Sequence, residues 1–351
     1  YDQAQRILGG CFTLQVAISL VLTAVLLIWN RPLLLAFGAS LAAHAQTVIK
    51  FSHVVAQDTP KGKAAEFFAK KADELTKGKV KVEVYANSAL YKDKEEMEAL
   101  QLGSVQMLAP SLAKFGPLGV KEFEVFDLPF IFDNRDELHK ITAGPVGAKL
   151  FKKLEARGIT GLAYWDNGFK VFSANKPLHT VADYKGLKYR IQSSKVLEEE
   201  IRALGGIPQV IAFGETYQAL QTGVIDAGFT GVEAANSRKF YEVQKFGVAS
   251  NIILAFDNLV VNPAWWKGLP ADVRSAIQAA ADKAVARSIR KSDGIPPENI
   301  KVLNEKGMKA VALTKAQEKV MADAMQPAVK KEFLRATAPD GVKLLEALDK
   351  L

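Results

Sequence analysis

The sequence predicts an α/β protein of two lobes, each with a parallel sheet of the doubly wound kind. Its 351 residues are long for a single hydrophobic core, and 49% of them are apolar, as in ordinary globular proteins. Segments with the alternating pattern of strands take turns with segments that have the periodicity of helices. Such an order of strand, helix and strand favours parallel pairing.

The first lobe is expected to begin after residue 45. Pro60 stands where a helix is expected to start, a position in which proline is well tolerated. A turn is predicted at Asn167 and Gly168, at the end of the last strand of this lobe. We expect strands at residues 48–54, 80–85, 105–109 and 159–165, and helices at 60–75, 94–102, 134–139 and 146–157.

A second unit is expected from about Lys170. Its last helix is long and amphipathic, with small and aliphatic residues along one side. We expect strands at residues 187–191, 207–212, 226–230 and 259–262, and helices at 195–204, 215–222 and 270–291.

Cationic and amide side chains follow several of these strands. Ligands of open α/β sheets bind beyond the carboxyl ends of the strands, so these loops are candidates for a binding cleft between two lobes that close on each other. Arg190 is the main candidate, because a guanidinium can grip a carboxylate with two parallel N–H bonds. The candidates are Lys114, Asn167, Lys170, Arg190 and Thr230.

Composition limits the other classes of function. The net charge of +8 comes from lysines spread along the chain among acidic residues, which argues against a nucleic-acid partner. The one cysteine, Cys11, and four scattered histidines exclude an internal disulfide and a thiolate zinc site. With no serine elbow and no paired carboxylates, we predict no catalytic residues, no metal and no cofactor, and keep a periplasmic organic-acid enzyme as the alternative.

The first 45 residues differ from the rest. Residues 9–29 are almost wholly apolar and long enough to span a bilayer. A shorter apolar run at 33–41 ends in Ala43, His44 and Ala45, which matches a signal-peptide site with cleavage after Ala45. We expect an N-terminal extension of uncertain origin at 1–30, a signal-peptide-like segment at 31–45 and export to the periplasm, with membrane anchoring through residues 9–29 as the alternative.

Six separated motifs stand in the order known from one family, at residues 51–60, 111–115, 127–132, 165–170, 186–190 and 240–245. Over residues 46–351 the chain resembles the extracytoplasmic solute-binding subunit of tripartite ATP-independent periplasmic (TRAP) transporters. Within that family it is most similar to the branch that binds four-carbon dicarboxylates.

The resemblance implies a periplasmic binding protein-like fold, class II-like, with crossing hinge strands and a long helix spanning both lobes. It places lobe I at residues 46–168 plus 257–295 and lobe II at 169–256 plus 296–351. It also implies a monomer that closes on its ligand and delivers it to TRAP membrane subunits. The expected ligand is of the succinate, fumarate or malate class, with another keto, hydroxy or sugar acid as the alternative.

The resemblance assigns roles to individual residues. Arg190 is expected to form the salt bridge to a substrate carboxylate, and Lys170 to supply a second cation. In one respect the chain departs from the family, because Thr230 stands where an Asn is usual and offers a hydroxyl in place of an amide. Other expected contacts are Ser111 and Lys114 after an early strand, Phe213 beside the substrate, and His53 or its neighbours on the first-lobe wall.

Overall fold

The structure is a computed structural model that describes residues 19, 20, 23, 46–132, 135–288 and 297–348. The larger compact unit of the chain is Val48–Leu351, and its first strand starts one residue earlier, at Thr47. The predicted signal-peptide segment at 31–45 and its cleavage site lie outside the described residues, as does nearly all of the apolar run at 9–29. Within the described residues, no helix is both long and apolar enough to cross a membrane.

One mixed sheet of nine strands runs through the described part of the chain. The strands lie in the order β2-β1-β3-β8-β4-β7-β5-β6, and β9 pairs with β8 outside this path. Their bounds are β1 Thr47–Ser52, β2 Val80–Tyr85, β3 Met107–Leu108, β4 Thr160–Ala174, β5 Lys188–Ile191, β6 Ile207–Val210, β7 Ala227–Gly231, β8 Phe246–Val261 and β9 Lys309–Ala312.

Most helices begin where the sequence analysis places them. The Thr59 hydroxyl accepts the Gly62 N–H at the start of α2, and Ser194 accepts the Leu197 N–H at the start of α6. The bounds are α2 Pro60–Thr76, α3 Glu96–Gln101, α4 Arg135–Ala143, α5 Pro145–Glu155, α6 Lys195–Ala203, α7 Thr216–Gln221, α8 Val232–Ser237, α9 Pro263–Gly268, α10 Ala271–Ser288, α11 Pro297–Glu305, α12 Lys315–Thr337 and α13 Asp340–Leu348; the short 3₁₀ helices are η1 Leu112–Lys114, η2 Lys121–Asp127, η3 Val181–Tyr184, η4 Phe213–Glu215 and η5 Phe240–Glu242.

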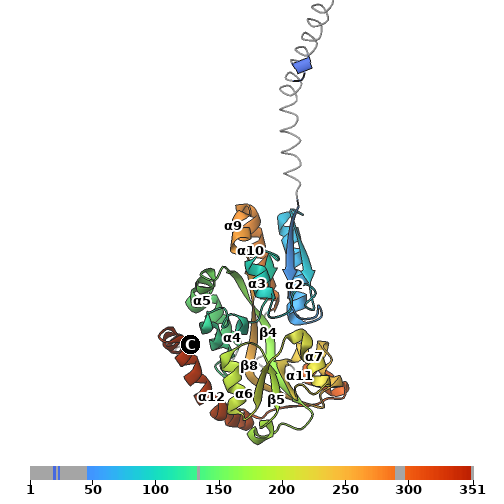
Figure 1. The fold of residues 1–351 in the computed structure, drawn as a ribbon, viewed down its shortest axis with the longest axis vertical. Helices are drawn as coiled ribbons and strands as arrows, with labels where there is room; N and C mark the ends of the chain where they lie inside the picture. Colours follow the sequence, from blue (N-terminus) through green and yellow to red (C-terminus); the bar gives the residue numbers. More distant parts are fainter. Residues whose placement is uncertain (1–18, 21–22, 24–45, 133–134, 289–296, 349–351) are drawn as a thin grey trace, which may run out of the picture. The chain divides into compact units, whose positions relative to one another are not determined.

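Two lobes share the long strands β4 and β8, which lie at the centre of Figure 1. The first lobe contains β1–β3 with α2 and α10, and the second contains β5–β7 with α6, α7 and α8. The predicted parallel pairing is confirmed within each lobe, for β1 with β3 and for β5 with β6 and β7. It is wrong for β4 and β8, which pair antiparallel with each other, because each crosses from one lobe to the other in opposite directions.

The turn predicted at Asn167 and Gly168 is also wrong, because β4 continues through these residues. The register between β4 and β8 shifts between Asp166 and Phe169, which marks a β-bulge. Gly168 takes a positive φ of 81° in this bulge, and its N–H donates to an Asp166 carboxylate oxygen at 2.7 Å. A buried ion pair with Arg135 holds the same carboxylate.

Two long helices have different places in the fold. Helix α10 confirms the predicted amphipathic helix up to Ser288, and it packs on α2 and β4 in the first lobe. Helix α12 packs against α6 of the second lobe and against η2, which follows the first-lobe strands, so α12 is the helix that spans both lobes. The resemblance implied such a helix, but no pattern in the sequence predicted its residues.

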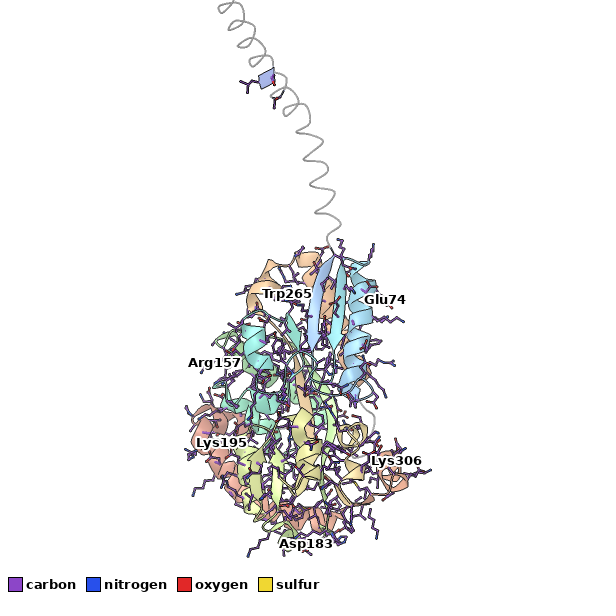
Figure 2. The ribbon with its side chains drawn as sticks, turned by 45° about the vertical axis from the view of Figure 1, so that its right-hand side comes forward. Glu74, Arg157, Asp183, Lys195, Trp265 and Lys306 are labelled. Atoms are coloured by element: carbon purple, nitrogen blue, oxygen red, sulfur yellow. The ribbon has the colours of Figure 1, made fainter. Side chains whose placement is uncertain are left out.

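Aromatic side chains fill the interior, and charged side chains cover the outside. Phe51, Phe68 and Trp165 pack together in the first-lobe core with ring centroids 5.9 and 6.0 Å from Phe51. Glu74 and Lys306 are exposed and point outward, as Figure 2 shows. The charges buried between the lobes are therefore exceptions that require an explanation.

Candidate functional site

A pocket lies where the loops after the strands of both lobes meet. Seven of the eight residues predicted from the sequence line it, although they come from different elements of both lobes. They are Ser111, Lys114, Asn167, Lys170, Arg190, Phe213 and Thr230.

Arg190 projects from β5 in the second lobe and is 3% exposed. Its Nε donates to the Ile211 carbonyl at 2.9 Å, and its guanidinium carbon lies 5.6 Å from the centre of the Phe213 ring. Burial lowers the pKa of Arg190 and the charge of Asp93 partly offsets this, but a guanidinium stays protonated in proteins. Among the described residues, no carboxylate lies within ion-pair distance of Arg190, although the charge of Asp93 acts on it from farther away in the same pocket.

Lys170 lies in β4, just after the bulge. Its ammonium is 3.4 Å from an Asp127 carboxylate oxygen and 5.3 Å from the centre of the Phe229 ring. Burial raises the pKa of Asp127, against the opposing effect of Lys170, and raises the pKa of nearby Glu200 well above its usual value. Lys170 is therefore paired, but with a carboxyl whose ionised form is itself disfavoured.

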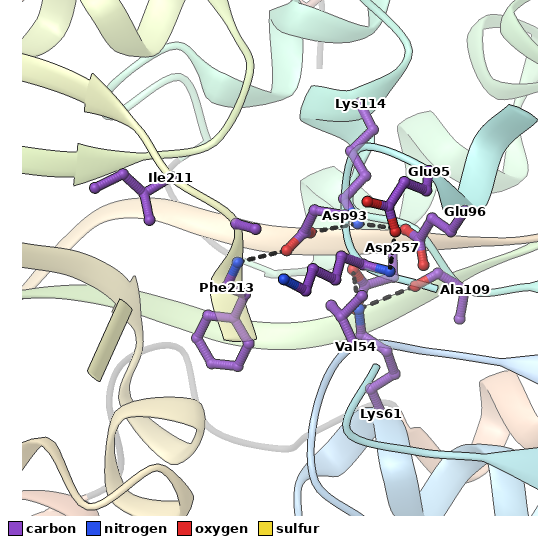
Figure 3. A network of polar contacts seen from close by, with 12 residues as sticks. Val54, Lys61, Asp93, Glu95, Glu96, Ala109, Lys114, Ile211, Phe213 and Asp257 are labelled. Carbon is purple, nitrogen blue, oxygen red and sulfur yellow. Dashed lines mark hydrogen bonds and ion pairs between the residues drawn. The ribbon is translucent and has the colours of Figure 1, made fainter. Parts of the chain in front are cut away.

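Lys114, at the end of η1, is enclosed by acids. Its ammonium lies 2.5 Å from an Asp93 oxygen and donates to Glu96 (Figure 3). Burial lowers the pKa of Lys114, but the charges of Glu96 and Asp93 outweigh this and hold it above the usual value. Lys114 was predicted as a ligand contact, and the structure places it in the pocket wall with its charge already balanced by two carboxylates.

A second lysine of the first lobe is also paired. Lys61, near the start of α2, lies 3.0 Å from an Asp257 oxygen of β8 and donates to the Ala109 carbonyl at 2.9 Å (Figure 3). The backbones of Asp257 and Ser111 are in turn paired in an isolated antiparallel β-bridge. These contacts fix the backbone of the loop that carries Ser111.

Uncharged side chains complete the pocket. Asn167 stands in the β4 bulge, and Thr230 pairs with Val171 at the end of β7. Two guanidinium groups lie near the Phe213 ring, that of Arg190 at 5.6 Å and that of Arg238 at 5.2 Å from its centre. The pocket thus offers hydroxyl and amide groups around the guanidinium of Arg190.

His53 is the predicted site residue that does not line the pocket. It is fully buried after β1, and its ring meets the Phe51 ring edge-on at 6.1 Å between centroids. Burial and the charge of Lys61 lower its pKa to about 3, so the imidazole is neutral. Its neighbours Val54 and Val55 do line the pocket.

Several polar residues of the pocket were not predicted from the sequence. Asp93 belongs to the run Lys92, Asp93, Lys94, Glu95, Glu96, which has the composition of a solvated helix start. Nothing in that run separates Asp93 from its exposed neighbours, and only the fold brings it beside Lys114. The residues missed in this way are Lys61, Asp93, Gln192 and Asp257.

Comparison with known proteins gives this pocket a context. Residues 51–336 match the family described as bacterial extracellular solute-binding protein, family 7. The chain is 58% identical over 264 residues to the C4-dicarboxylate-binding periplasmic protein DctP of Rhodobacter capsulatus, covering 75% of this chain and 77% of that protein.

Solved structures agree with this match. One is a TRAP periplasmic solute binding protein from Sulfurospirillum deleyianum with bound succinate, which has a TM-score of 0.81 and 39% identity and covers 87% of this chain and 99% of that one. Another, from Pseudomonas aeruginosa with bound L-malate, has a TM-score of 0.74 and 36% identity and covers 81% of this chain and 99% of that one. The chain therefore belongs to family 7 of the bacterial extracellular solute-binding proteins, the family of the TRAP periplasmic binding subunits.

Proposed function

We propose that this chain binds a four-carbon dicarboxylate of the succinate, fumarate or malate class and delivers it to a TRAP membrane complex. The observation that carries this proposal is Arg190, a buried guanidinium without a carboxylate partner among the described residues, aimed into a pocket between two lobes. A buried charge without a partner is costly, and an anionic ligand would remove that cost. The names and bound ligands of the similar proteins support the same class of ligand.

The second carboxylate is assigned to Lys170. The ion pair of Lys170 with Asp127 has an N–O distance of 3.4 Å. This is longer than the distances of 3.0 Å between Lys61 and Asp257 and 2.5 Å between Lys114 and Asp93. A hydrogen bond to a charged group contributes about 1.5–3 kcal/mol. Two such contacts would supply a large part of the roughly 8 kcal/mol of a micromolar complex. In this proposal Ser111, Asn167 and Thr230 orient the acid and Phe213 covers it.

The lobes are proposed to close on the acid about β4 and β8. We place the boundaries between residues 168 and 169 and between 256 and 257, where the β4 bulge faces β8. The ligand shifts this equilibrium by its preference for the closed form. We also propose that the protein acts as a monomer in the periplasm, and that residues 31–45 direct its export and are removed after Ala45.

A ligand panel tests the proposal. Purified protein is screened by thermal shift against mono- and dicarboxylates, including keto, hydroxy and sugar acids, and the hits are measured by isothermal titration. We expect one dicarboxylate per chain and no chemical change in that ligand by NMR. Preferential binding of a monocarboxylic sugar acid would contradict the substrate class, and turnover would show an enzyme.

Cell fractionation tests the location. Mass spectrometry of the exported protein is expected to find Gln46 at the N-terminus and the protein in the periplasmic fraction. Recovery in the membrane fraction with residues 9–29 intact would instead show anchoring.

A further inference from the structure

The Asp93 carboxylate joins the two lobes at the pocket. Asp93 stands in the loop between β2 and α3, and one of its oxygens lies 2.5 Å from the ammonium of Lys114 in the same lobe. Its other oxygen accepts the backbone N–H of Phe213, at the start of η4 in the second lobe, at 2.5 Å. Figure 3 shows the carboxylate between these two partners.

Lys92 with Glu215 and Arg238 with Val54 also join the lobes near Asp93, and they differ from it in burial or in charge. Lys92 and Glu215 lie 2.8 Å apart, but their side chains are 53% and 52% exposed, so water screens the pair. Arg238 donates to the Val54 carbonyl at 3.0 Å and forms no ion pair within the part of the chain that the structure describes. Of these three contacts, the one made by Asp93 combines a full charge with a side chain that is 12% exposed.

The Asp93 contact depends on closure. Phe213 follows β6, so opening the lobes would carry its N–H away from the first-lobe loop that holds Asp93. Asp93 would keep Lys114, because both belong to the same lobe, and would lose its hydrogen bond to the second lobe. Burial raises the pKa of Asp93, but the charges of Lys114 and Arg190 outweigh it and keep the carboxylate ionised. The contact is therefore a charge-assisted hydrogen bond that opening of the lobes would break.

We propose that Asp93 is a latch that holds the lobes closed through the Phe213 N–H and thereby slows the release of ligand. This inference rests on the proposed function for the identity of the ligand. Part of the free energy of closure would then come from the protein itself. Asp93 would act as a positioning residue for closure, without itself binding the acid.

The test compares three variants of the full chain by stopped-flow binding of succinate. Asp93→Ala removes the acceptor, Asp93→Asn keeps an acceptor without the charge, and Asp58→Asn changes an exposed loop aspartate of the same lobe as a control. We expect Asp93→Ala to speed dissociation roughly tenfold, with a smaller change in association, and Asp93→Asn to have an intermediate effect. Asp58→Asn should match the wild type.

A second measurement separates the latch from a loss of folding and from the choice of ligand. Small-angle X-ray scattering of the ligand-free proteins should give a larger radius of gyration for Asp93→Ala than for the wild type, while circular dichroism stays the same. Unchanged dissociation in both Asp93 variants, or tighter binding, would overturn the latch. If the wild type binds no dicarboxylate, the proposed function fails, and an equal radius of gyration in all variants would then overturn the latch independently.

Discussion

Arg190 and Lys114 reach the same pocket from opposite lobes, but they differ in their ion-pair partners. Lys114 is enclosed by Asp93 and Glu96, whereas Arg190 contacts a carbonyl and an aromatic ring. Both are buried cations, and from sequence both were candidates for contact with an acid. The difference teaches that a cation in a pocket is available to a ligand only when the protein has not already neutralised it.

We therefore expect Lys114 to matter mainly for folding and Arg190 mainly for binding. The pairs Lys114 with Asp93 and Lys61 with Asp257 stabilise the wall of the pocket. Arg190 has no ion-pair partner among the described residues, and we propose that it binds the ligand. Removing Lys114 should therefore affect mainly folding, and removing Arg190 should affect mainly binding.

Lys114→Met is expected to have the largest effect. It leaves Asp93 and Glu96 buried beside each other without a cation, and breaking a buried pair from one side costs roughly 3–5 kcal/mol of unfolding free energy. Urea unfolding measures the loss, with Lys63→Met, at an exposed position of α2, as the control. Full stability together with lost binding would show that Lys114 serves the ligand after all.

Arg190→Ala is expected to lower the affinity for succinate by about 2–5 kcal/mol, because it removes the charge that the acid would pair with. Stability should change less, because no ion pair is broken. Arg190→Lys should also bind more weakly, since an ammonium does not reproduce the planar fork. Isothermal titration is the measurement, and Arg202→Ala, which removes exposed ion pairs, is the control. Unchanged affinity in Arg190→Ala would refute the clamp.

Buried acids can also be compared by whether the protein balances their charge, and Glu124 is one such acid. Glu124 accepts the Val196 N–H at 3.1 Å from the start of α6, and burial, opposed by this hydrogen bond, raises its pKa from 4.5 to about 7. A raised pKa gives a contribution to stability that is complete below the unfolded pKa and is lost as the pH rises through about 7. Between pH 5 and 8, the free energy of unfolding of the wild type should therefore fall by roughly 2–3 kcal/mol more than that of Glu124→Gln.

Chemical denaturation at a series of pH values measures this difference. Glu98→Gln, at an exposed position of α3, should keep the wild-type pH dependence. Identical curves for the wild type and Glu124→Gln would contradict the raised pKa.

Thr230→Asn should have the smallest effect. It replaces a hydroxyl at the pocket with an amide that both donates and accepts. We expect malate, which carries a hydroxyl, to gain about 1 kcal/mol of affinity relative to succinate. Competition titration measures the ratio, and Thr222→Asn at an exposed position is the control. An unchanged ratio would show that Thr230 does not contact the ligand.

Local patterns predicted most elements but misjudged the two strands that make the site. Strand β4 was expected to end at Asn167, because Asn and Gly together are typical of a turn. Strand β8 was expected only at residues 259–262, although it begins at Phe246, since polar residues such as Asp257 interrupt its apolar pattern. Both errors have one cause: polar side chains and a bulge inside a central strand are tolerated where that strand lines a pocket.

The sequence by itself determined the family, through six motifs in a fixed order, and it made Arg190 a candidate, because an Arg at the end of a strand is a local feature. The tertiary structure decided which charges are free. Asp93 meets the Phe213 N–H from 120 residues away, and Lys170 meets Asp127 from 43 residues away, so no local pattern encodes these pairs. Charge neutralisation depends on distance in space and on burial, and both are properties of the folded chain.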